Sequence, residues 1–398
     1  MSTAQTGPRL AAVLRSSERV TPLELFFDLV FVLAITQCTA LMATEADWHG
    51  LGQGLLVLGV LWWSWVGYAW LTSVVDPEEG IVRLTMFAAM GALLICALCV
   101  PEAFDDSALV FACAYGGVRA AQVALLIVAG RDDPPLRHSA IGLAISTAIG
   151  AGLLVAASFT DGALQGALWA LALALDMGGP LVIDASGWRL SPSHFAERHG
   201  LIVIIALGES IVAIGVGAER IEVDLGVALA ALLGVATAAA LWWLYFDVVA
   251  LVAERRLTNA APGLAQNRIA RDSYSYLHFV MVAGIVLLAL GLKKTLEHVE
   301  DPLKIVPAVA LLGGTGIYLL AHVAFRWRNV HRFSGQRLVA ALVLAALVPA
   351  ALELPALATL ALVVAVLTSL IAYERPRFAA LRDRLRHQLA SEPAAGPS

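Results

Sequence analysis

Charged side chains are scarce in this chain. Asp, Glu, Lys and Arg make up only 14% of its 398 residues, whereas 60% are hydrophobic and the mean hydropathy is +0.80. A soluble domain cannot bury that much apolar surface, so the composition excludes the soluble globular classes and indicates an integral membrane protein with several spans. The net charge of −5 is less informative than the positions of the charges.

Cysteines and catalytic motifs are also scarce. The four cysteines lie in apolar segments, where we expect small buried side chains. Cys96 and Cys99 form a C-x-x-C pattern, but no second pair completes a metal site. The sequence shows no nucleotide-binding loop, no nucleophile with a positioned base and no histidine pair typical of haem binding. We therefore predict no cofactor, no metal and no nucleic-acid partner, and an enzymatic role is not favoured.

Long hydrophobic runs dominate instead. About twelve segments have spanning length or slightly less, which predicts an all-α polytopic membrane protein. These segments are residues 23–43, 52–72, 84–100, 108–129, 138–158, 164–183, 200–217, 225–252, 273–292, 305–325, 337–352 and 355–373. Residues 1–20 are polar, so we expect no cleavable signal peptide. Residues 374–398 are predicted to form an exposed helix followed by a disordered end.

The basic residues fall mainly on one side of the predicted spans. With the N-terminus inside, the inner segments hold 21 of the 26 Lys and Arg residues. The acidic loops at 44–47 and 101–106 then lie outside without a Lys or Arg. Because cytoplasmic loops carry an excess of Lys and Arg, we expect both termini to be cytoplasmic.

Short matches between the two halves indicate an internal repeat. Leu61-Trp62-Trp63 matches Leu241-Trp242-Trp243, and Glu18-Arg19 matches Glu197-Arg198 at nearly the same offset. The pattern predicts two parallel six-helix repeats, at 21–184 and 185–373, between a cytoplasmic segment 1–20 and a cytoplasmic tail 374–398.

The first span carries two acids. Glu24 and Asp28 are four residues apart and share one helix face, with Ile35 two turns further along. A carboxylate at membrane depth is costly, so it points into a bundle or a polar path. Two readings stay open: an ion path with Ile35 as an apolar constriction, or acids that bond to Trp, Arg or backbone and fix helix packing.

The seventh span also carries an acid at membrane depth. Glu209 lies about halfway along it, either as a relay for a proton or cation or as a partner of Arg119. Gly208 and Gly215 would allow close helix contact. Further ionisable residues at membrane depth are Arg119, Asp176, Asp247, His278 and His322.

A polar cluster precedes this span. It consists of His194, Glu197, Arg198 and His199, with Arg19 at the equivalent place before the first span. The spacing is not that of a metalloprotease and no third ligand is specified, so we predict an interfacial cluster at the cytoplasmic entrance rather than a metal site.

Two stretches resemble a known family. Residues 21–37 (Thr-Pro-Leu-Glu-Leu-Phe-Phe-Asp-Leu-Val-Phe-Val-Leu-Ala-Ile-Thr-Gln) and residues 194–215, which begin His-Phe-Ala-Glu-Arg-His-Gly, are similar to signature segments of the bacterial low temperature requirement protein A family. The resemblance covers roughly residues 15–380. It implies a multi-pass protein of the bacterial cell (inner) membrane and specifies no reaction.

A second resemblance concerns the first span alone. Phe26-Phe27-Asp28 is similar to the Phe-Ser-Asp motif in the first helix of lysosomal and bacterial potassium channels, which are also built from six-helix repeats. Phe27 replaces the serine, and the seventh span does not repeat the pattern. This resemblance implies a pore lined by the first and seventh helices.

These observations leave two classes of function. The first is movement of a monovalent cation or proton along a path lined by the first and seventh spans, through Glu24, Asp28, Ile35 and Glu209. The second is a membrane enzyme or lipid-handling protein in cold or stress adaptation, or a structural membrane protein without turnover. The lipid bilayer is the expected partner in either case, and the sequence leaves the oligomeric state open.

Overall fold

The chain is helical, as its composition predicts. The computed structural model describes residues 19–182, 187–219 and 221–391. The protein is 85% helix, and no strand forms within those ranges. Most of the predicted segment 1–20 and the end of the predicted tail, residues 392–398, lie outside the described residues. The all-α prediction is confirmed.

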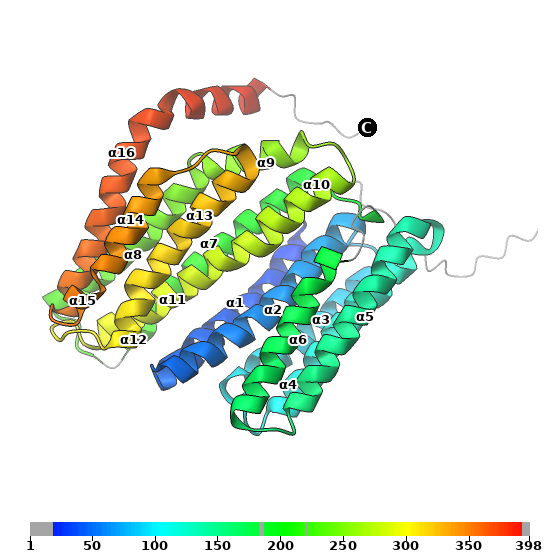
Figure 1. Ribbon diagram of the computed structural model, residues 1–398, viewed down its shortest axis with the longest axis horizontal. Coiled ribbons are helices and arrows are strands. Elements are labelled where there is room, and N and C mark those ends of the chain that lie inside the picture. The colour runs from blue at the N-terminus through cyan, green and yellow to red at the C-terminus, as the bar shows by residue number, and fades with distance from the viewer. Residues whose placement is uncertain (1–18, 183–186, 220, 392–398) are drawn as a thin grey trace, which may run out of the picture. The chain divides into compact units, whose positions relative to one another are not determined.

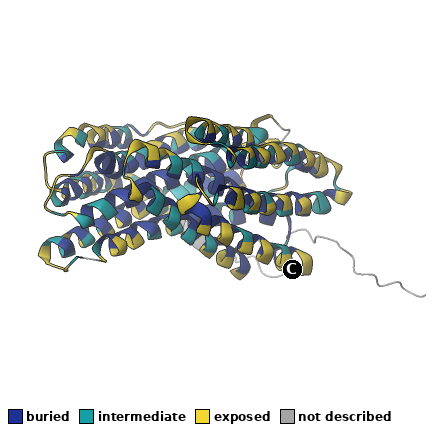
Figure 2. Cartoon of the chain, turned by 90° about the horizontal axis from the view of Figure 1, so that it is seen from below, coloured by how far each residue is buried: buried dark blue, intermediate teal, exposed yellow. Residues whose placement is uncertain are grey.

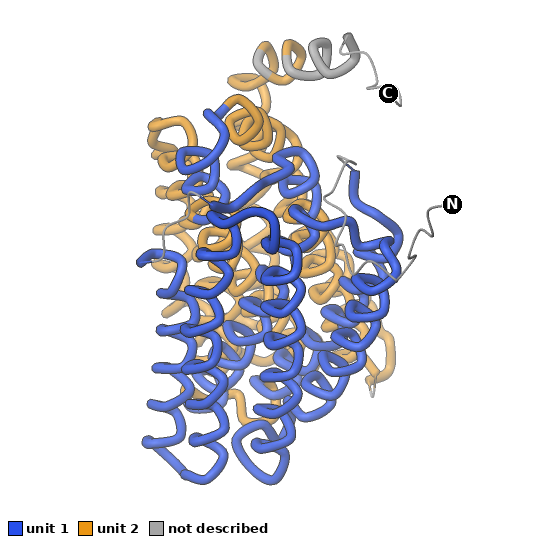
Figure 3. Tube along the Cα trace, turned by 90° about the vertical axis from the view of Figure 1, so that its right-hand side faces the viewer, with its two compact units in different colours: residues 1–42, 49–198, 260–271 blue, residues 43–48, 199–259, 272–398 orange. Residues whose placement is uncertain are grey.

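The helices form two compact units, drawn in different colours in Figure 3. Unit 1 comprises residues 1–42, 49–198 and 260–271, and unit 2 comprises residues 43–48, 199–259 and 272–398. The first turns of the seventh helix, up to Arg198, belong to unit 1.

Unit 1 is a bundle of long helices (Figure 1). They are α1 (Pro22–Thr44), α2 (Trp48–Val74), α3 (Gly80–Cys99), α4 (Ala108–Ala129), α5 (Pro134–Ala157) and α6 (Gly162–Val182), with the start of α7 (Pro192–Ala218) and the short α10 (Leu264–Ile269). Helices α3 to α6 pack in sequence order, each against the next. The side chain of Asp133 caps α5 by accepting a hydrogen bond from the Leu136 amide.

Helix α2 is the core of unit 1. In its most apolar window 83% of the residues are buried, against 22% in α6. Trp62 and Trp65 stack with ring centroids 5.1 Å apart, and Phe27 of α1 packs on Tyr68 at 4.8 Å. Many helices in Figure 2 carry both buried and exposed residues, as expected of helices that face lipid on one side.

Unit 2 contains the rest of α7 and the C-terminal helices. They are α8 (Leu225–Phe246), α9 (Val249–Thr258), α11 (His278–Glu297), α12 (Ile305–Ala308), α13 (Gly314–Val330), α14 (Gly335–Ala346), α15 (Val348–Ala351) and α16 (Ala356–Ser391). Two π-helical segments, Ala270–Leu277 and Val309–Gly313, precede α11 and α13. Helix α16 bends in its last part (Figure 1), and Pro376 lies inside it.

Close packing in unit 2 depends on glycines of α11. A Cβ added at Gly291 would lie 2.5 Å from Cα of Leu311, and one at Gly284 would lie 2.7 Å from the carbonyl oxygen of Gly314. A Cβ at Gly208 or Gly215 of α7 would meet no atom of the described residues within 4 Å. The expectation of close helix contact at Gly208 and Gly215 is therefore wrong, and the contact occurs along α11 instead.

Eleven helices of the described ranges are long and apolar enough to cross a membrane, one fewer than the predicted twelve. The predicted segment 337–352 consists of α14, which has 12 residues, and the four residues of α15. Twelve residues rise only about 18 Å, short of the hydrocarbon core of about 30 Å. Pro349 explains the break, because proline lacks the amide hydrogen that continues a helix.

Candidate functional site

The buried face of α1 carries both acids of the first span. Glu24 and Asp28 are fully buried, and so are Phe27, Phe31 and Ile35, whereas Leu25, Phe26 and Leu29 are exposed. The i, i+4 spacing thus brings two carboxylates and an apolar stripe to one side of the helix, toward the interior of unit 1.

Glu24 is held by its own helix terminus. Its Oε2 atom accepts hydrogen bonds from the amide and the hydroxyl of Thr21, at 2.9 and 3.1 Å, while Thr21 Oγ1 lies 3.4 Å from the amide of Glu24. This reciprocal arrangement is a capping box, which the Thr-x-x-Glu spacing encodes. The cap leaves Oε1 of Glu24 facing Nε2 of His194, 2.7 Å away.

Asp28 is held by Trp65 and Arg198. The indole Nε1 of Trp65 donates to Asp28 Oδ1 at 2.8 Å, and Nη2 of Arg198 donates to the same oxygen at 2.6 Å. Nη1 of Arg198 donates to Thr72 Oγ1 at 3.0 Å and lies 3.7 Å from Oε1 of Glu24. The guanidinium also lies 5.4 Å from the ring centroid of Trp65. These contacts join α7 to α1 and α2.

We call this group the α1–α7 cluster. It consists of Glu24, Asp28, Trp65, Thr72, His194 and Arg198, each with 0% exposure. Among the described residues, Oδ2 of Asp28 and Nε of Arg198 have no hydrogen-bond partner. The two carboxylates carry two negative charges and the guanidinium one positive charge. Within these six residues the charges sum to one negative charge, which one additional proton on Glu24, Asp28 or His194 would balance, and a buried net charge is costly.

Comparisons with known proteins support the family resemblance of residues 21–37 and 194–215. A family model described as "Bacterial low temperature requirement A protein (LtrA)" matches residues 19–372. The chain belongs to the LtrA family. A relative from Rhizobium meliloti (strain 1021), "Uncharacterized protein RA0937", is 30% identical over 308 residues, which cover 74% of each chain. No solved structure matches the chain.

In this LtrA-family protein the two signature stretches therefore meet in space. Residues 21–37 supply Glu24 and Asp28, and residues 194–215 supply His194 and Arg198, across 170 positions of sequence. The chain is a multi-pass membrane protein, as the family and the eleven apolar helices indicate. The partners Trp65 and Thr72 escaped the sequence analysis, although Trp65 lies beside the repeated Trp pair.

The predicted entrance cluster of this LtrA protein separates in the structure. His194 and Arg198 are fully buried in the α1–α7 cluster, whereas Glu197 is exposed and accepts a hydrogen bond from the Val20 amide at 3.0 Å. Arg19 is exposed as well. His199 belongs to unit 2, where its ring lies 5.3 Å from that of Tyr274. Successive positions of one helix face different neighbours, so the five residues do not form one cluster.

A second buried ion pair lies elsewhere in unit 1. Nη2 of Arg119 on α4 lies 2.9 Å from Oδ1 of Asp176 on α6, and Tyr115 donates to Oδ2 of Asp176 at 2.8 Å. Arg119 also donates to Thr147 of α5 at 2.9 Å and to the carbonyl oxygen of Trp63 of α2 at 3.4 Å. The partner of Arg119 is thus Asp176, and the suggestion of Glu209 is wrong. The pair joins four helices.

The remaining predicted residues lie in unit 2. Glu209 of α7 is 2% exposed. His278 donates from Nδ1 to the carbonyl of Ser273 at 2.9 Å and lies 2.7 Å from the Tyr245 hydroxyl, which fits a neutral ring that accepts at Nε2. His322 makes the same kind of Nδ1 contact with the Tyr318 carbonyl at 2.8 Å.

Asp247, predicted at membrane depth, forms an ion pair within unit 2. Its Oδ2 atom lies 3.1 Å from Nη1 of Arg382 on α16. Within the described ranges, no group of three or more His, Cys, Asp or Glu residues could hold a metal ion.

Proposed function

We propose that this LtrA-family protein moves protons across the bacterial inner membrane along a path lined by α1 and α7. The observation that carries the proposal is the 2.7 Å contact between His194 Nε2 and Glu24 Oε1, which joins two groups that can each gain or lose a proton. Buried ionisable side chains inside membrane spans are the usual components of proton relays.

The charge balance of the α1–α7 cluster supports a mobile proton. With Arg198 permanently charged and two carboxylates beside it, the six residues of the cluster are neutral when one proton is bound, and the short contact between Glu24 and His194 offers that proton two positions. The proton can move from Nε2 of His194 to Oε1 of Glu24, which leaves a neutral imidazole and a neutral carboxylic acid. Loss of that proton toward one side and uptake from the other would complete a transfer.

The same geometry favours a proton over a monovalent metal cation. A cation at either carboxylate would lie close to the guanidinium of Arg198, which is 2.6 Å from Asp28 Oδ1 and 3.7 Å from Glu24 Oε1. Repulsion between two positive charges is strong at low dielectric. A proton binds to one oxygen and adds no separate ion to the site.

Ile35 and Glu209 keep their predicted roles in the proposal, whereas Asp28, predicted to lie on the path of the moving charge, takes a fixed role. Asp28 is the fixed counter-ion of Arg198, Ile35 is an apolar constriction two turns along the same face of α1, and Glu209 carries the path further along α7. Ile35 is 1% exposed and Glu209 is 2% exposed.

A structural role without turnover is the second candidate. It is favoured by the ion pairs of Asp28 with Arg198 and of Asp176 with Arg119, which satisfy charges from α1, α4, α6 and α7. The lipid-chemistry alternative required His194, Glu197 and His199 to gather at one cavity. Their separate partners do not support it.

We extend the proposal to topology. The Lys and Arg bias supports cytoplasmic termini, an arrangement that requires an even number of crossings, with α14 and α15 together as the twelfth. Two parallel six-helix repeats remain part of the proposal on the sequence matches alone, Leu61-Trp62-Trp63 with Leu241-Trp242-Trp243 and Glu18-Arg19 with Glu197-Arg198.

Ion selectivity in proteoliposomes tests the proposal. We expect protein-dependent proton flux, measured with an internal pH dye, without uptake of potassium or sodium in parallel vesicles. Asp28→Asn and Glu209→Gln should each lower the proton flux at least about tenfold, equivalent to about 1.4 kcal/mol. Asp106→Asn, at an exposed acid of unit 1, is the matched control and should retain the parent's rate. Potassium uptake without proton flux would overturn the proposal.

A further inference from the structure

A basic cavity of about 460 Å³ lies within unit 2, outside the α1–α7 cluster. Its walls come from α8 and α9, the end of α13, the start of α14, and α16. Six arginines line it: Arg326, Arg332, Arg337, Arg375, Arg377 and Arg384. The volume lies in the range of small-molecule sites.

The acids of this cavity do not neutralise its arginines. Among the described residues, Asp247 and Glu374 are the carboxylates that line it, and each already has a partner. Nη2 of Arg337 lies 2.7 Å from Oε2 of Glu374, and Arg382 holds Asp247 at 3.1 Å. In the described part of the chain, none of the other five arginines of the lining lies within ion-pair distance of a carboxylate. The cavity therefore has an excess of positive charge that suits an anion.

Apart from Asn329, the rest of the described lining is apolar. Val248 and Val252 line one side, Phe325 and Ile371 another, and the guanidinium of Arg326 lies 5.2 Å from the ring centroid of Phe378. Trp243, at 37% exposure, stands at the edge. A cavity with both arginines and branched aliphatic side chains suits a ligand with an anionic group and a hydrocarbon part.

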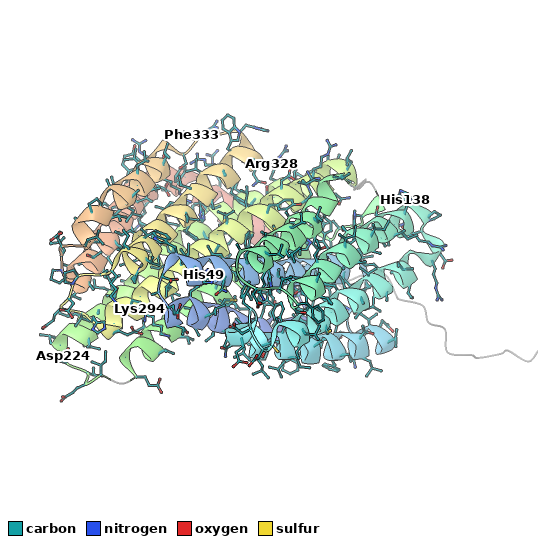
Figure 4. All side chains as sticks on the ribbon, turned by 60° about the horizontal axis from the view of Figure 1, so that its bottom comes forward. His49, His138, Asp224, Lys294, Arg328 and Phe333 are labelled. Atoms are coloured by element: carbon teal, nitrogen blue, oxygen red, sulfur yellow. The ribbon has the colours of Figure 1, made fainter. Side chains whose placement is uncertain are left out.

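The cavity lies where a membrane would offer such a ligand. Figure 4 shows Arg328 and Phe333 at one end of unit 2 and Asp224 and Lys294 at the other. Arg326 near the end of α13 and Arg332 in the connection from α13 to α14 line the cavity, close in sequence to Arg328 and Phe333. Helices that cross a bilayer have their ends at the level of the lipid headgroups, and basic pockets between such helices bind anionic headgroups.

We propose that this cavity binds the phosphate of an anionic phospholipid, with Arg326 and Arg375 as its main guanidinium contacts and the valine and phenylalanine wall against the acyl chain. Guanidinium groups bind phosphate oxygens in pairs of charge-assisted hydrogen bonds. Arg337 and Glu374 position the wall, because their ion pair joins α14 to α16. The proposal does not depend on proton movement.

Lipid binding to the full chain tests this site. The protein in phosphatidylcholine nanodiscs is titrated with short-chain phosphatidylglycerol, and bound lipid is counted by native mass spectrometry. We expect Arg326→Gln with Arg375→Gln to weaken phosphatidylglycerol binding at least about tenfold. Arg131→Gln with Arg137→Gln, at two exposed arginines of unit 1, is the matched control and should bind like the parent.

Three further measurements distinguish loss of lipid binding from loss of folding and from binding of free phosphate. Unchanged thermal stability of the double variant in pure phosphatidylcholine shows that it folds. Arg326→Lys with Arg375→Lys keeps the charge and should bind with intermediate affinity, since lysine loses the paired hydrogen bonds. Equal binding of phosphatidylglycerol and phosphatidylcholine, or full binding by the glutamine variant, would overturn the proposal. Inorganic phosphate that competes at the lipid's own affinity would reassign the site to free phosphate and also overturn it.

Discussion

Nε2 of His194 lies 2.7 Å from Oε1 of Glu24, and both side chains are fully buried. This contact joins the first turns of α7 to the first turns of α1. Both residues belong to unit 1, which includes α7 up to Arg198. The contact also places a titratable imidazole beside a carboxylate whose neighbour Arg198 supplies a permanent charge.

Loss of Arg198 should destabilise the protein strongly. Arg198→Gln leaves Asp28 as a buried carboxylate with only the Trp65 hydrogen bond among its described contacts. Breaking one side of a buried ion pair costs about 3–5 kcal/mol. Reversible denaturation in detergent micelles measures the free energy of unfolding.

The matched double variant separates charge pairing from packing. Arg198→Met with Asp28→Leu removes both charges, so it should recover most of the lost stability. If Arg198→Gln alone costs less than about 1 kcal/mol, as an exposed pair would, the described burial of this ion pair is contradicted.

The capping box of α1 should contribute a smaller share of stability. Thr21→Val keeps the shape of the side chain but removes the hydroxyl that lies 3.1 Å from Glu24 Oε2. Loss of such a cap costs about 0.5–2 kcal/mol. Thr85→Val, at an exposed hydroxyl that donates to its own helix, serves as the control in the same denaturation measurement and should change stability little. A larger loss at Thr85 than at Thr21 would count against the cap.

The Arg119–Asp176 pair should affect stability and leave proton flux unchanged in the folded fraction. Arg119→Lys keeps the charge, but one ammonium cannot reproduce contacts to Thr147, Asp176 and Gln122 together. We expect a loss of about 2–4 kcal/mol in unfolding free energy from the unsatisfied buried groups. Flux in proteoliposomes, normalised to folded protein, should equal that of the parent. A loss of flux without a loss of stability would place this pair in the path.

The glycines of α11 should tolerate no side chain. Gly291→Ala places a methyl group 2.5 Å from Cα of Leu311, so backbone must move. Overpacking of this kind costs about 1–3 kcal/mol. Gly215→Ala meets open space and should stabilise or leave α7 unchanged. Gly291→Ala should therefore have the lower melting temperature of the two variants, both in detergent and in nanodiscs. A lower melting temperature for Gly215→Ala would contradict the described helix contact.

The sequence predicted the class of the fold and the two stretches that build the site. Apolar runs longer than the bilayer core identify spans without knowledge of packing, and eleven of them became helices of spanning length. The segment 337–352 failed because Pro349 divides an apolar run that hydropathy alone treats as continuous. Which face of a helix meets which neighbour depends on tertiary packing.

The contacts of the two acids with other helices could not be predicted from the sequence either. The i, i+4 spacing predicted that Glu24 and Asp28 share a face, and the structure confirms it. No local rule links Asp28 to Trp65 or Arg198, which are 37 and 170 positions away. The sequence did not predict that Arg119 pairs with Asp176 rather than Glu209 for the same reason, because sequence spacing carries no information on contacts between distant helices.

Proton flux through His194 is the decisive measurement. Proteoliposomes with an internal pH dye and a membrane potential, set by a potassium gradient in the presence of valinomycin, report proton entry. They are compared for the parent, for His194→Gln and for the control His138→Gln, at an exposed histidine of α5. We predict flux well above that of protein-free vesicles for the parent and for His138→Gln. For His194→Gln we predict a decrease of at least about a hundredfold, equivalent to about 2.7 kcal/mol. Parent flux equal to that of empty vesicles, or equal flux in His194→Gln and the parent, would contradict the account.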